Sequence, residues 1–271
     1  MNPVRPLASV CPIDSPEAMV AAIRHFGILP FFRCGVPGWS VEELTAPGCW
    51  FSDEEDTFLG PWDWKIDAVR EGDIAYGKFL GGKAAFATVE WYRELMNWRR
   101  SQPRYKMAEG GRYRATTAHD KLMKRLAPVA LGAIREAGAL EARELRLICS
   151  ANEKAPVKKN VMDSVIQFLQ MGTWTVIGDF ERVYRGPELT YRGWQRASNT
   201  TPDELFAAPV LPLASSSLPA PSSSQLLSSS SSSVADPLAT ALTPAASRAR
   251  LIAHIREFFP VANLKLLEKL F

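Results

Sequence analysis

The chain has 271 residues, of which 46% are hydrophobic, and its 32 basic and 29 acidic side chains leave a net charge of only +3. This length suits one large or two small domains, and the apolar content excludes a chain that is disordered throughout. No apolar run approaches the roughly 18 residues that a membrane span needs, so we expect no membrane partner.

The N-terminus and the cysteines indicate the compartment. Pro3, Pro6 and Pro12 interrupt an N-terminal stretch that lacks the basic and apolar regions of a secretory signal. The four cysteines have no C-x-x-C spacing, so we expect neither a disulfide framework nor a cysteine-rich zinc site. These features favour a cytoplasmic protein.

The charge is distributed unevenly along the chain. Residues 1–90 hold 7 basic and 13 acidic side chains, net −6, whereas residues 91–200 hold 20 basic and 11 acidic ones, net +9. Residues 201–271 hold five of each. A basic middle favours a polyanionic partner. The alternatives are that the acidic and basic parts pack against each other or that both lie in solvent.

In the first ninety residues the pattern predicts one helix and one β-hairpin. Asp14 or Ser15 can cap a helix over residues 16–25, which Gly27 ends. Residues 31–64 form an irregular segment rich in aromatic residues and proline. Two strands over residues 74–80 and 84–88 are joined by two glycines, which is typical of a hairpin.

A group of acids lies among tryptophans in the irregular segment. Crowded carboxylates raise one another's pKa and can divide acid and base roles, so they are our candidates for catalysis. We favour the alternative of a solvated acidic loop over an aromatic mini-core. The three histidines are too widely separated to form a metal site, and we expect no cofactor. The catalytic candidates are Asp53, Glu54, Glu55, Asp56 and Asp63.

The basic middle begins with cations interleaved with aromatic residues over residues 91–125. Cations that bind phosphates and aromatic rings that stack on bases are typical of a nucleic-acid surface. The alternative is a solvated helix face with the aromatic residues in the core. The candidates for DNA contact here are Arg99, Arg100, Arg104 and Lys106.

Three helices followed by a β-hairpin are predicted next, over residues 128–138, 140–148 and 157–171 and then 173–194. This order is the winged-helix arrangement, a helix-turn-helix variant whose third helix would enter the major groove while the wing touches the backbone. Many winged helices bind protein instead; the basic third helix and wing favour double-stranded DNA. The candidates are Lys158, Lys159, Asn160, Ser164 and Gln167 on the helix, and Arg182, Arg185 and Arg192 on the wing.

The last part of the chain reads as a linker and a helix. Residues 209–237 contain twelve serines and five prolines, a composition that cannot bury enough apolar surface to offset its conformational entropy. Residues 246–271 have apolar residues at helical spacing, interrupted by Pro260, and we expect them to dock on the main body.

We therefore expect an α+β, winged-helix-based fold with a small N-terminal α/β-hairpin region and a C-terminal docking helix. The expected divisions are an N-terminal acidic and aromatic region (1–90), a basic winged-helix domain (91–205), a Ser/Pro-rich flexible linker (206–245) and a C-terminal helix (246–271).

Several segments of the chain resemble a bacterial family called AlkZ-related, distant relatives of the AlkZ/YcaQ winged-helix DNA glycosylases. The similarity covers about residues 15–205 and the terminal helix, with the serine-rich linker as an insertion. The segments are Gly27-Ile28-Leu29-Pro30-Phe31-Phe32, Trp50-Phe51-Ser52-Asp53-Glu54, Gly60-Pro61-Trp62-Asp63-Trp64-Lys65, Tyr76-Gly77-Lys78-Phe79 with Lys83-Ala84, and Leu169-Gln170-Met171.

Resemblance to the glycosylases implies tandem winged helices around a concave DNA-binding face and hydrolysis of the N-glycosidic bond of alkylated or crosslinked bases, without a metal. That activity depends on a Gln-x-Gln or Gln-x-Asp motif, which no glutamine of this chain begins. No catalytic residue is therefore carried over.

Three functional hypotheses follow from the sequence. The first is a winged-helix DNA-binding protein linked to repair of alkylated DNA, without catalysis by the glycosylase route. The second is a diverged DNA glycosylase or other hydrolase that uses the acidic and aromatic segment. The third is a protein-interaction module whose basic surface meets an acidic partner.

Overall fold

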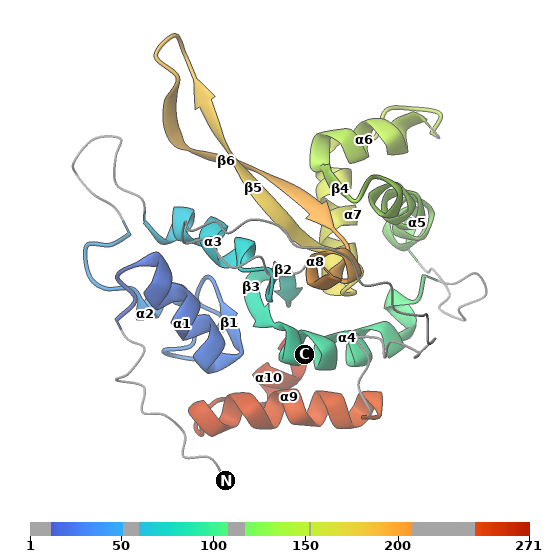
Figure 1. Cartoon of the computed structure of the whole chain (residues 1–271). Coiled ribbons are helices and arrows are strands. Elements are labelled where there is room, and N and C mark those ends of the chain that lie inside the picture. The colour runs from blue at the N-terminus through green and yellow to red at the C-terminus, as the bar shows by residue number, and fades with distance from the viewer. Residues whose placement is uncertain (1–11, 51–59, 108–116, 152, 208–241) are drawn as a thin grey trace, which may run out of the picture.

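The computed structural model describes residues 12–50, 60–107, 117–151, 153–207 and 242–271 (Figure 1). Within these residues the strands form two three-stranded sheets, and helices pack on the first and on part of the second. Buried apolar side chains gather in two clusters, one around the first sheet and one among α5, α6 and α7. The fold class is α+β, as the sequence predicts.

The first sheet has the strand order β1-β3-β2, all antiparallel. Its strands are β1 (Ile28–Pro30), β2 (Ile74–Leu80) and β3 (Lys83–Thr88). Gly81 and Gly82 form the β2–β3 turn with φ of 58° and 81°, a conformation that glycine adopts without steric cost. The predicted hairpin is therefore confirmed, and β1 adds a third strand that was not predicted.

Helix α1 (Pro16–Phe26) packs on this sheet and agrees with the predicted helix. The Ser15 hydroxyl accepts a hydrogen bond from the Ala18 amide at its start, and Gly27 ends it with φ of 67°. A Cβ atom at Gly27 would lie 2.2 Å from the indole ring of Trp91, so both the turn and the packing require glycine there.

The segment that was expected to be irregular contains two helices, α2 (Val41–Leu44) and α3 (Pro61–Arg70). That expectation was wrong because the composition of the segment hides their start signals. Ser40 caps α2 through its side chain, and Pro61 takes the first position of α3, where its missing amide costs nothing.

Helix α4 (Val89–Ser101) follows β3 and packs in the same cluster as the first sheet. The sequence analysis placed it in the basic middle, yet Tyr92, Leu95 and Met96 are buried with the N-terminal residues. A 3₁₀ turn, η2 (Pro103–Tyr105), follows α4.

The three-helix cluster consists of α5 (Ala118–Ala137), α6 (Ala142–Ala151) and α7 (Lys159–Met171). The prediction that Pro128 starts the first of these helices was wrong, because Pro128 lies inside α5. Thr117 and Asp120 form a capping box at the true start. Burial of Leu126, Ala130 and Ile134 stabilises the helix on both sides of the proline, which removes a single backbone hydrogen bond.

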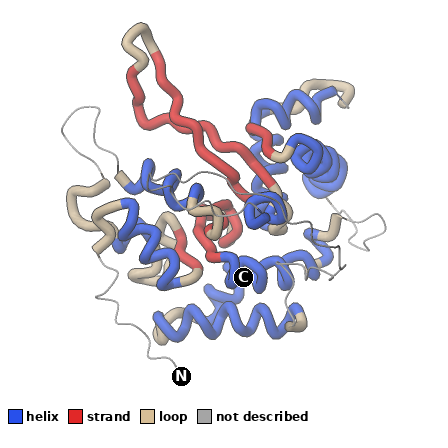
Figure 2. The backbone as a smooth tube through the Cα atoms, in the orientation of Figure 1, coloured by secondary structure: helices blue, strands red, loops and turns tan. Residues whose placement is uncertain are grey.

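The second sheet has the order β4-β6-β5, with β4 (Ala139–Glu141), β5 (Val176–Arg185) and β6 (Thr190–Thr200). Strand β4 lies where the sequence predicted the start of a helix at Leu140; that residue instead pairs with Asn199 of β6. The β5–β6 hairpin agrees with the predicted one and extends away from the body, on the side opposite α9 (Figures 1 and 2).

The C-terminal helices α9 and α10 pack against the cluster around the first sheet. Helix α8 (Pro202–Ala207) follows the hairpin, and α9 (Pro244–Phe258) and α10 (Leu264–Leu270) follow later in the chain. Leu251, Ile255 and Leu267 are buried in the cluster around the first sheet. The predicted helical residues after 246 therefore do dock on the body, beside α4 (Figure 1).

Candidate functional site

Helix α7 has two packed faces and an exposed N-terminal end. Met162, Val165 and Leu169 are buried in the three-helix cluster. The second face meets the first sheet near the end of the helix, where a Cβ atom at Gly82 would lie 2.4 Å from Nε2 of Gln167. Lys159 and Asn160, the first two residues of the helix, are exposed, so the free part of α7 is its N-terminal end.

This end of α7 carries cations at a position where the helix favours anions. Lys158, Lys159 and Asn160 are exposed, the first turn holds no acid, and Lys158 provides no side-chain cap. The unpaired amides of a helix N-terminus carry partial positive charge, so two lysines placed there are repelled by the amides. An anion bound at this end would be attracted by the amides and by the lysines. Neither lysine makes an ion pair with another described residue.

Arg99 is buried in the core and does not lie on the predicted DNA surface. It is 1% exposed, and its guanidinium donates to the carbonyl oxygens of Phe79 and Leu270. Burial lowers the pKa of this group. A side chain enclosed in this way cannot reach a phosphate, so the expectation for Arg99 was wrong.

Arg100 also contacts other parts of the chain. It is half-buried, donates to the carbonyl oxygen of Thr173 at 2.8 Å, and lies 4.4 Å from the centre of the Trp174 ring. It therefore joins the end of α4 to the segment between α7 and β5.

Three further candidates line one cavity of about 340 Å³ between η2, α5 and α7. Arg104, Ser164 and Gln167 meet there with Lys124. The Ser164 hydroxyl donates to the carbonyl oxygen of Asn160 within the helix. Lys106 is exposed after η2, outside this lining. The sequence analysis assigned these residues to two separate elements, and the fold brings them together.

The candidates on the hairpin differ from one another. Arg182 points back to the body, with Nε 3.6 Å from Oδ1 of Asp63, whereas Arg185 is exposed at the end of β5. Arg192 belongs to β6, but its side chain lies outside the described part of the structure. Arg185 is thus a hairpin candidate left to solvent.

Of the acidic candidates, Asp53, Glu54, Glu55 and Asp56 lie outside the described residues. Asp63 is buried at the start of α3, where its Oδ1 accepts hydrogen bonds from the Tyr191 hydroxyl at 2.6 Å and from Gln195 Nε2 at 3.0 Å. Desolvation and this hydrogen bond raise the pKa of Tyr191 to about 12. The carboxylate therefore joins α3 to the hairpin.

Lys65 belongs to the same region, and the sequence pointed to it only through the segment Gly60-Pro61-Trp62-Asp63-Trp64-Lys65. It is 1% exposed, its Nζ donates to the carbonyl oxygen of Trp62 at 2.6 Å, and Nζ lies 3.3 Å from the centre of the Trp62 ring. Burial lowers its pKa to about 7, opposed by the charge of Asp63. No local pattern marks it, because its burial comes from packing against the hairpin residue Phe180.

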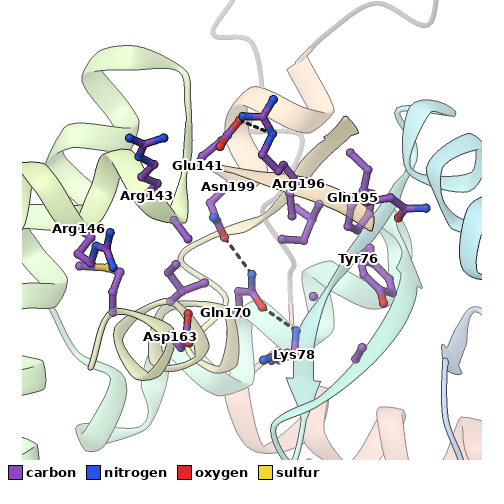
Figure 3. A pocket seen from close by; sticks show the side chains of 18 of the residues that line it. Tyr76, Lys78, Glu141, Arg143, Arg146, Asp163, Gln170, Gln195, Arg196 and Asn199 are labelled. Carbon is purple, nitrogen blue, oxygen red and sulfur yellow. Dashed lines mark hydrogen bonds and ion pairs between the residues drawn. The ribbon is translucent and has the colours of Figure 1, made fainter. Parts of the chain in front are cut away.

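A second, larger cavity of about 590 Å³ lies between the three-helix cluster, β2 and the hairpin (Figure 3). Gln170 of α7 is 2% exposed at its centre. Its Oε1 accepts from the Lys78 amide at 2.9 Å, and its Nε2 donates to Oδ1 of Asn199 at 3.0 Å. Gln170 thus ties α7 to both sheets. The sequence pointed to this residue only through the segment Leu169-Gln170-Met171.

Cations surround this cavity: Lys78, Arg143, Arg146, Lys159 and Arg196. Arg196 lies 3.7 Å from Glu141 and 2.8 Å from Glu181. The other four make no ion pair with a described residue. Among them, only Lys159 was a candidate for DNA contact from the sequence, and Lys78 stood in the family segment Tyr76-Gly77-Lys78-Phe79. The two α6 arginines are three residues apart on one helix face, a spacing that a solvated helix also shows.

The described residues show neither a metal cluster nor a membrane-spanning helix. They contain no group of three or more His, Cys, Asp or Glu side chains that could hold a metal ion. None of their helices is long and apolar enough to cross a membrane.

Comparison with known proteins gives one result. The family model described as AlkZ related matches residues 13–241. No curated protein and no solved structure matches the chain. The matched range contains the first sheet, the three-helix cluster and the hairpin. The chain therefore belongs to the AlkZ-related family.

Proposed function

We propose that this AlkZ-related chain binds double-stranded DNA through a winged-helix unit made of α5 to β6, in a role linked to repair of alkylated DNA. The element order supports the first part: helix, strand, two helices and a hairpin, with β4 added to the hairpin as a third strand. In helix-turn-helix variants the recognition helix enters the major groove with its N-terminal residues at the bases. Resemblance to the AlkZ glycosylases supports the link to repair.

The observation that carries this proposal is the exposed cationic start of α7. Lys158 and Lys159 raise the positive potential at a helix end whose amides are already short of partners. The arrangement is unfavourable for the free protein and becomes favourable when a phosphate is bound. Asn160 is exposed beside them and has the donor and acceptor pair that reads adenine.

Other residues of the proposed surface follow from exposure. Arg143 is exposed on α6 and Arg185 on the hairpin, so both can add phosphate contacts on either side of α7. Arg104 and Lys106 are exposed near η2 and would extend the contact along the backbone. Ser164 and Gln167, half-buried in the smaller cavity, are secondary members of the surface.

The test is binding of a fluorescently labelled 20-bp duplex, followed by anisotropy over a series of NaCl concentrations. We expect affinity to fall steeply with salt, and the double variant K158A/K159A to lower the slope of log K against log[salt] by about 2. The matched control is K265A/K269A, which removes two exposed lysines from α10. Equal binding by the two double variants, or binding indifferent to salt, refutes the proposal. A protein partner retained after nuclease treatment, without duplex binding, would favour the interaction-module hypothesis instead.

A second proposal is a hydrolase that uses Asp63. The observation in its favour is the buried carboxylate beside Tyr191 and Gln195, since Gln195 also lines the larger cavity. Incubation with alkylated duplex, scored by abasic sites, compares the wild type with D63N and with D67N, an exposed acid on the same helix. The acids at 53–56 are replaced in turn. Absence of base release by the wild type, or full activity in every variant, excludes this mechanism.

A further inference from the structure

The larger cavity has an apolar side and a polar centre. Tyr76 and Phe180 form the apolar side together with Ile177, and both rings belong to the cluster around the first sheet. Gln170 and Asn199 lie at the centre, each 2% exposed. A volume of about 590 Å³ is within the range of small-molecule sites, and such sites combine apolar walls with a few fixed polar groups.

An unsatisfied acceptor lies at the same side. The Nε2 atom of Gln195 donates to Asp63 and to Tyr191, which fixes the orientation of the amide. Its Oε1 atom is buried and has no hydrogen-bond partner among the described residues. A buried acceptor without a donor costs the folded protein free energy.

The cations lie on the other side of the cavity. Figure 3 shows Arg143 and Arg146 on α6 across from Tyr76 and Gln195, with Gln170 between the two sides. Two acids also line the cavity: Glu141, which faces Arg196, and Asp163. With Arg196 and Glu141 paired, Lys78, Arg143, Arg146 and Lys159 stand against Asp163, so the lining is net positive.

We propose that this cavity binds one nucleotide, with its base against Tyr76 and Phe180 and its phosphate at Arg143 and Arg146. Aromatic rings and amides suit a flat base with hydrogen-bonding edges, and guanidinium groups suit a phosphate. The site shares Lys159 and Arg143 with the proposed duplex surface, whereas Tyr76, Phe180 and Gln170 belong to the cavity alone. The nucleotide is either free or an unpaired unit of a DNA strand, since both have the same chemistry.

Occupation of the site would add to the links that Gln170 makes between α7 and the two sheets. A nucleotide held there touches α6, β2 and β6 together, so it would restrict movement of the three-helix cluster against the first sheet. We therefore expect the ligand to raise the melting temperature of the whole chain, because it binds the folded state alone.

The experiment is isothermal titration calorimetry of the full chain with deoxyadenosine 5′-monophosphate, deoxyadenosine and inorganic phosphate. R143A/R146A removes the phosphate partners, and R135A/K154A is the matched control, since both of its residues are exposed on the three-helix cluster away from the cavity. A142W and A197W each place a large ring in the cavity from a different element. Thermal melting without ligand checks that every variant is folded.

We expect one nucleotide to bind per chain and the nucleoside to bind at least about tenfold more weakly, because it lacks the charged group. R143A/R146A should weaken binding about tenfold or more, A142W and A197W should abolish it, and R135A/K154A should leave it unchanged. Absence of nucleotide binding by the folded wild type, or binding by folded R143A/R146A or A142W that is as tight as that of the wild type, overturns the proposal.

A competition arm identifies the source of the nucleotide. A duplex with one unpaired adenosine is added to the complex with the mononucleotide, beside an intact duplex of the same length. Displacement by the first duplex alone assigns the site to a unit of DNA, and displacement by neither assigns it to a free nucleotide; both results support the site. Equal displacement by both duplexes contradicts recognition of an unpaired unit of DNA, because the unpaired base then adds nothing to the phosphate contacts at the shared cations.

Discussion

Replacement of Lys65 by Met should make the protein more stable at neutral pH and should remove part of its pH dependence. Lys65 is enclosed by Trp62 and Phe180, and its pKa is about 7 in the folded state against 10.5 for an ordinary lysine. At a pH between these two pKa values, Lys65 is protonated in the unfolded chain and neutral in the folded chain. The free energy of unfolding therefore rises with pH across this window, and below pH 7 the folded state bears the full cost of the buried charge.

The size of the effect follows from the difference in pKa. A shift of the Lys65 pKa from 10.5 to about 7 corresponds to a loss of about 5 kcal/mol in the free energy of unfolding at low pH. As the pH rises from 7 to 9, the free energy of unfolding regains about 2 kcal/mol of this loss. Methionine keeps the length of the side chain but removes the charge and the hydrogen bond to the Trp62 carbonyl, which is worth about 1 kcal/mol. K65M should thus be the more stable protein at pH 7 and should lose that advantage by pH 9 to 10.

Urea unfolding at pH 6.5, 8 and 9.5, followed by tryptophan fluorescence, measures this difference directly. All other titrating groups are common to both proteins and cancel when the two curves are subtracted. The control is K78M, an exposed lysine whose substitution should change stability by a constant amount at all three pH values. A difference between K65M and the wild type that does not vary with pH refutes the reasoning.

Two further substitutions test buried polar groups. Q170A should lower the free energy of unfolding by about 2 kcal/mol, because the Lys78 amide and the Asn199 side chain lose their partner; Q167A, on the same helix, should cost less than about 1 kcal/mol. Equal losses of unfolding free energy in Q170A and Q167A would show that the Gln170 hydrogen bonds do not stabilise the contact of α7 with the two sheets. R99M should cost about 2 to 4 kcal/mol by leaving the Phe79 and Leu270 carbonyls unpaired, measured by urea unfolding, with duplex affinity unchanged where the variant is folded. Weaker duplex binding at full stability would return Arg99 to the DNA surface.

Elements with local start and stop signals could be predicted from the sequence. Ser15 and Gly27 bound α1, and the glycine pair between two β-rich runs gives the hairpin of the first sheet. The third helix and the β5–β6 hairpin follow from apolar spacing in the same way. In these cases the information lies within a few residues of the element itself.

Elements that depend on distant partners could not be predicted. Strand β4 is three residues long and exists because Leu140 pairs with Asn199, some sixty positions later. Pro128 was taken for a helix start because prolines favour that position, yet the capping box at Thr117 and the buried face of α5 outweigh it. The site was hidden for the same reason, since Tyr76, Arg146 and Gln195 come from three distant segments.

Charge counting located the basic region but could not say which of its cations are free. Arg99 is enclosed in the core, Arg125 lies 2.6 Å from Glu153, and Arg196 faces Glu141 and Glu181. The acids of the first ninety residues have partners of their own: Arg24 binds Glu71 and Asp73, and Arg250 of α9 binds Glu90.

Within the described residues, the acids of residues 1–90 therefore do not neutralise the cations of residues 91–200, apart from ion pairs such as that of Arg182 with Asp63. Four of the cations that make no ion pair with a described residue lie on α6 and at the start of α7: Arg143, Arg146, Lys158 and Lys159. Their mutual repulsion costs the free protein stability, and a bound polyanion removes that cost. For this reason we expect R143A/R146A and K158A/K159A to be no less stable than the wild type while they lose their ligands, the pattern that separates binding residues from residues that hold the fold.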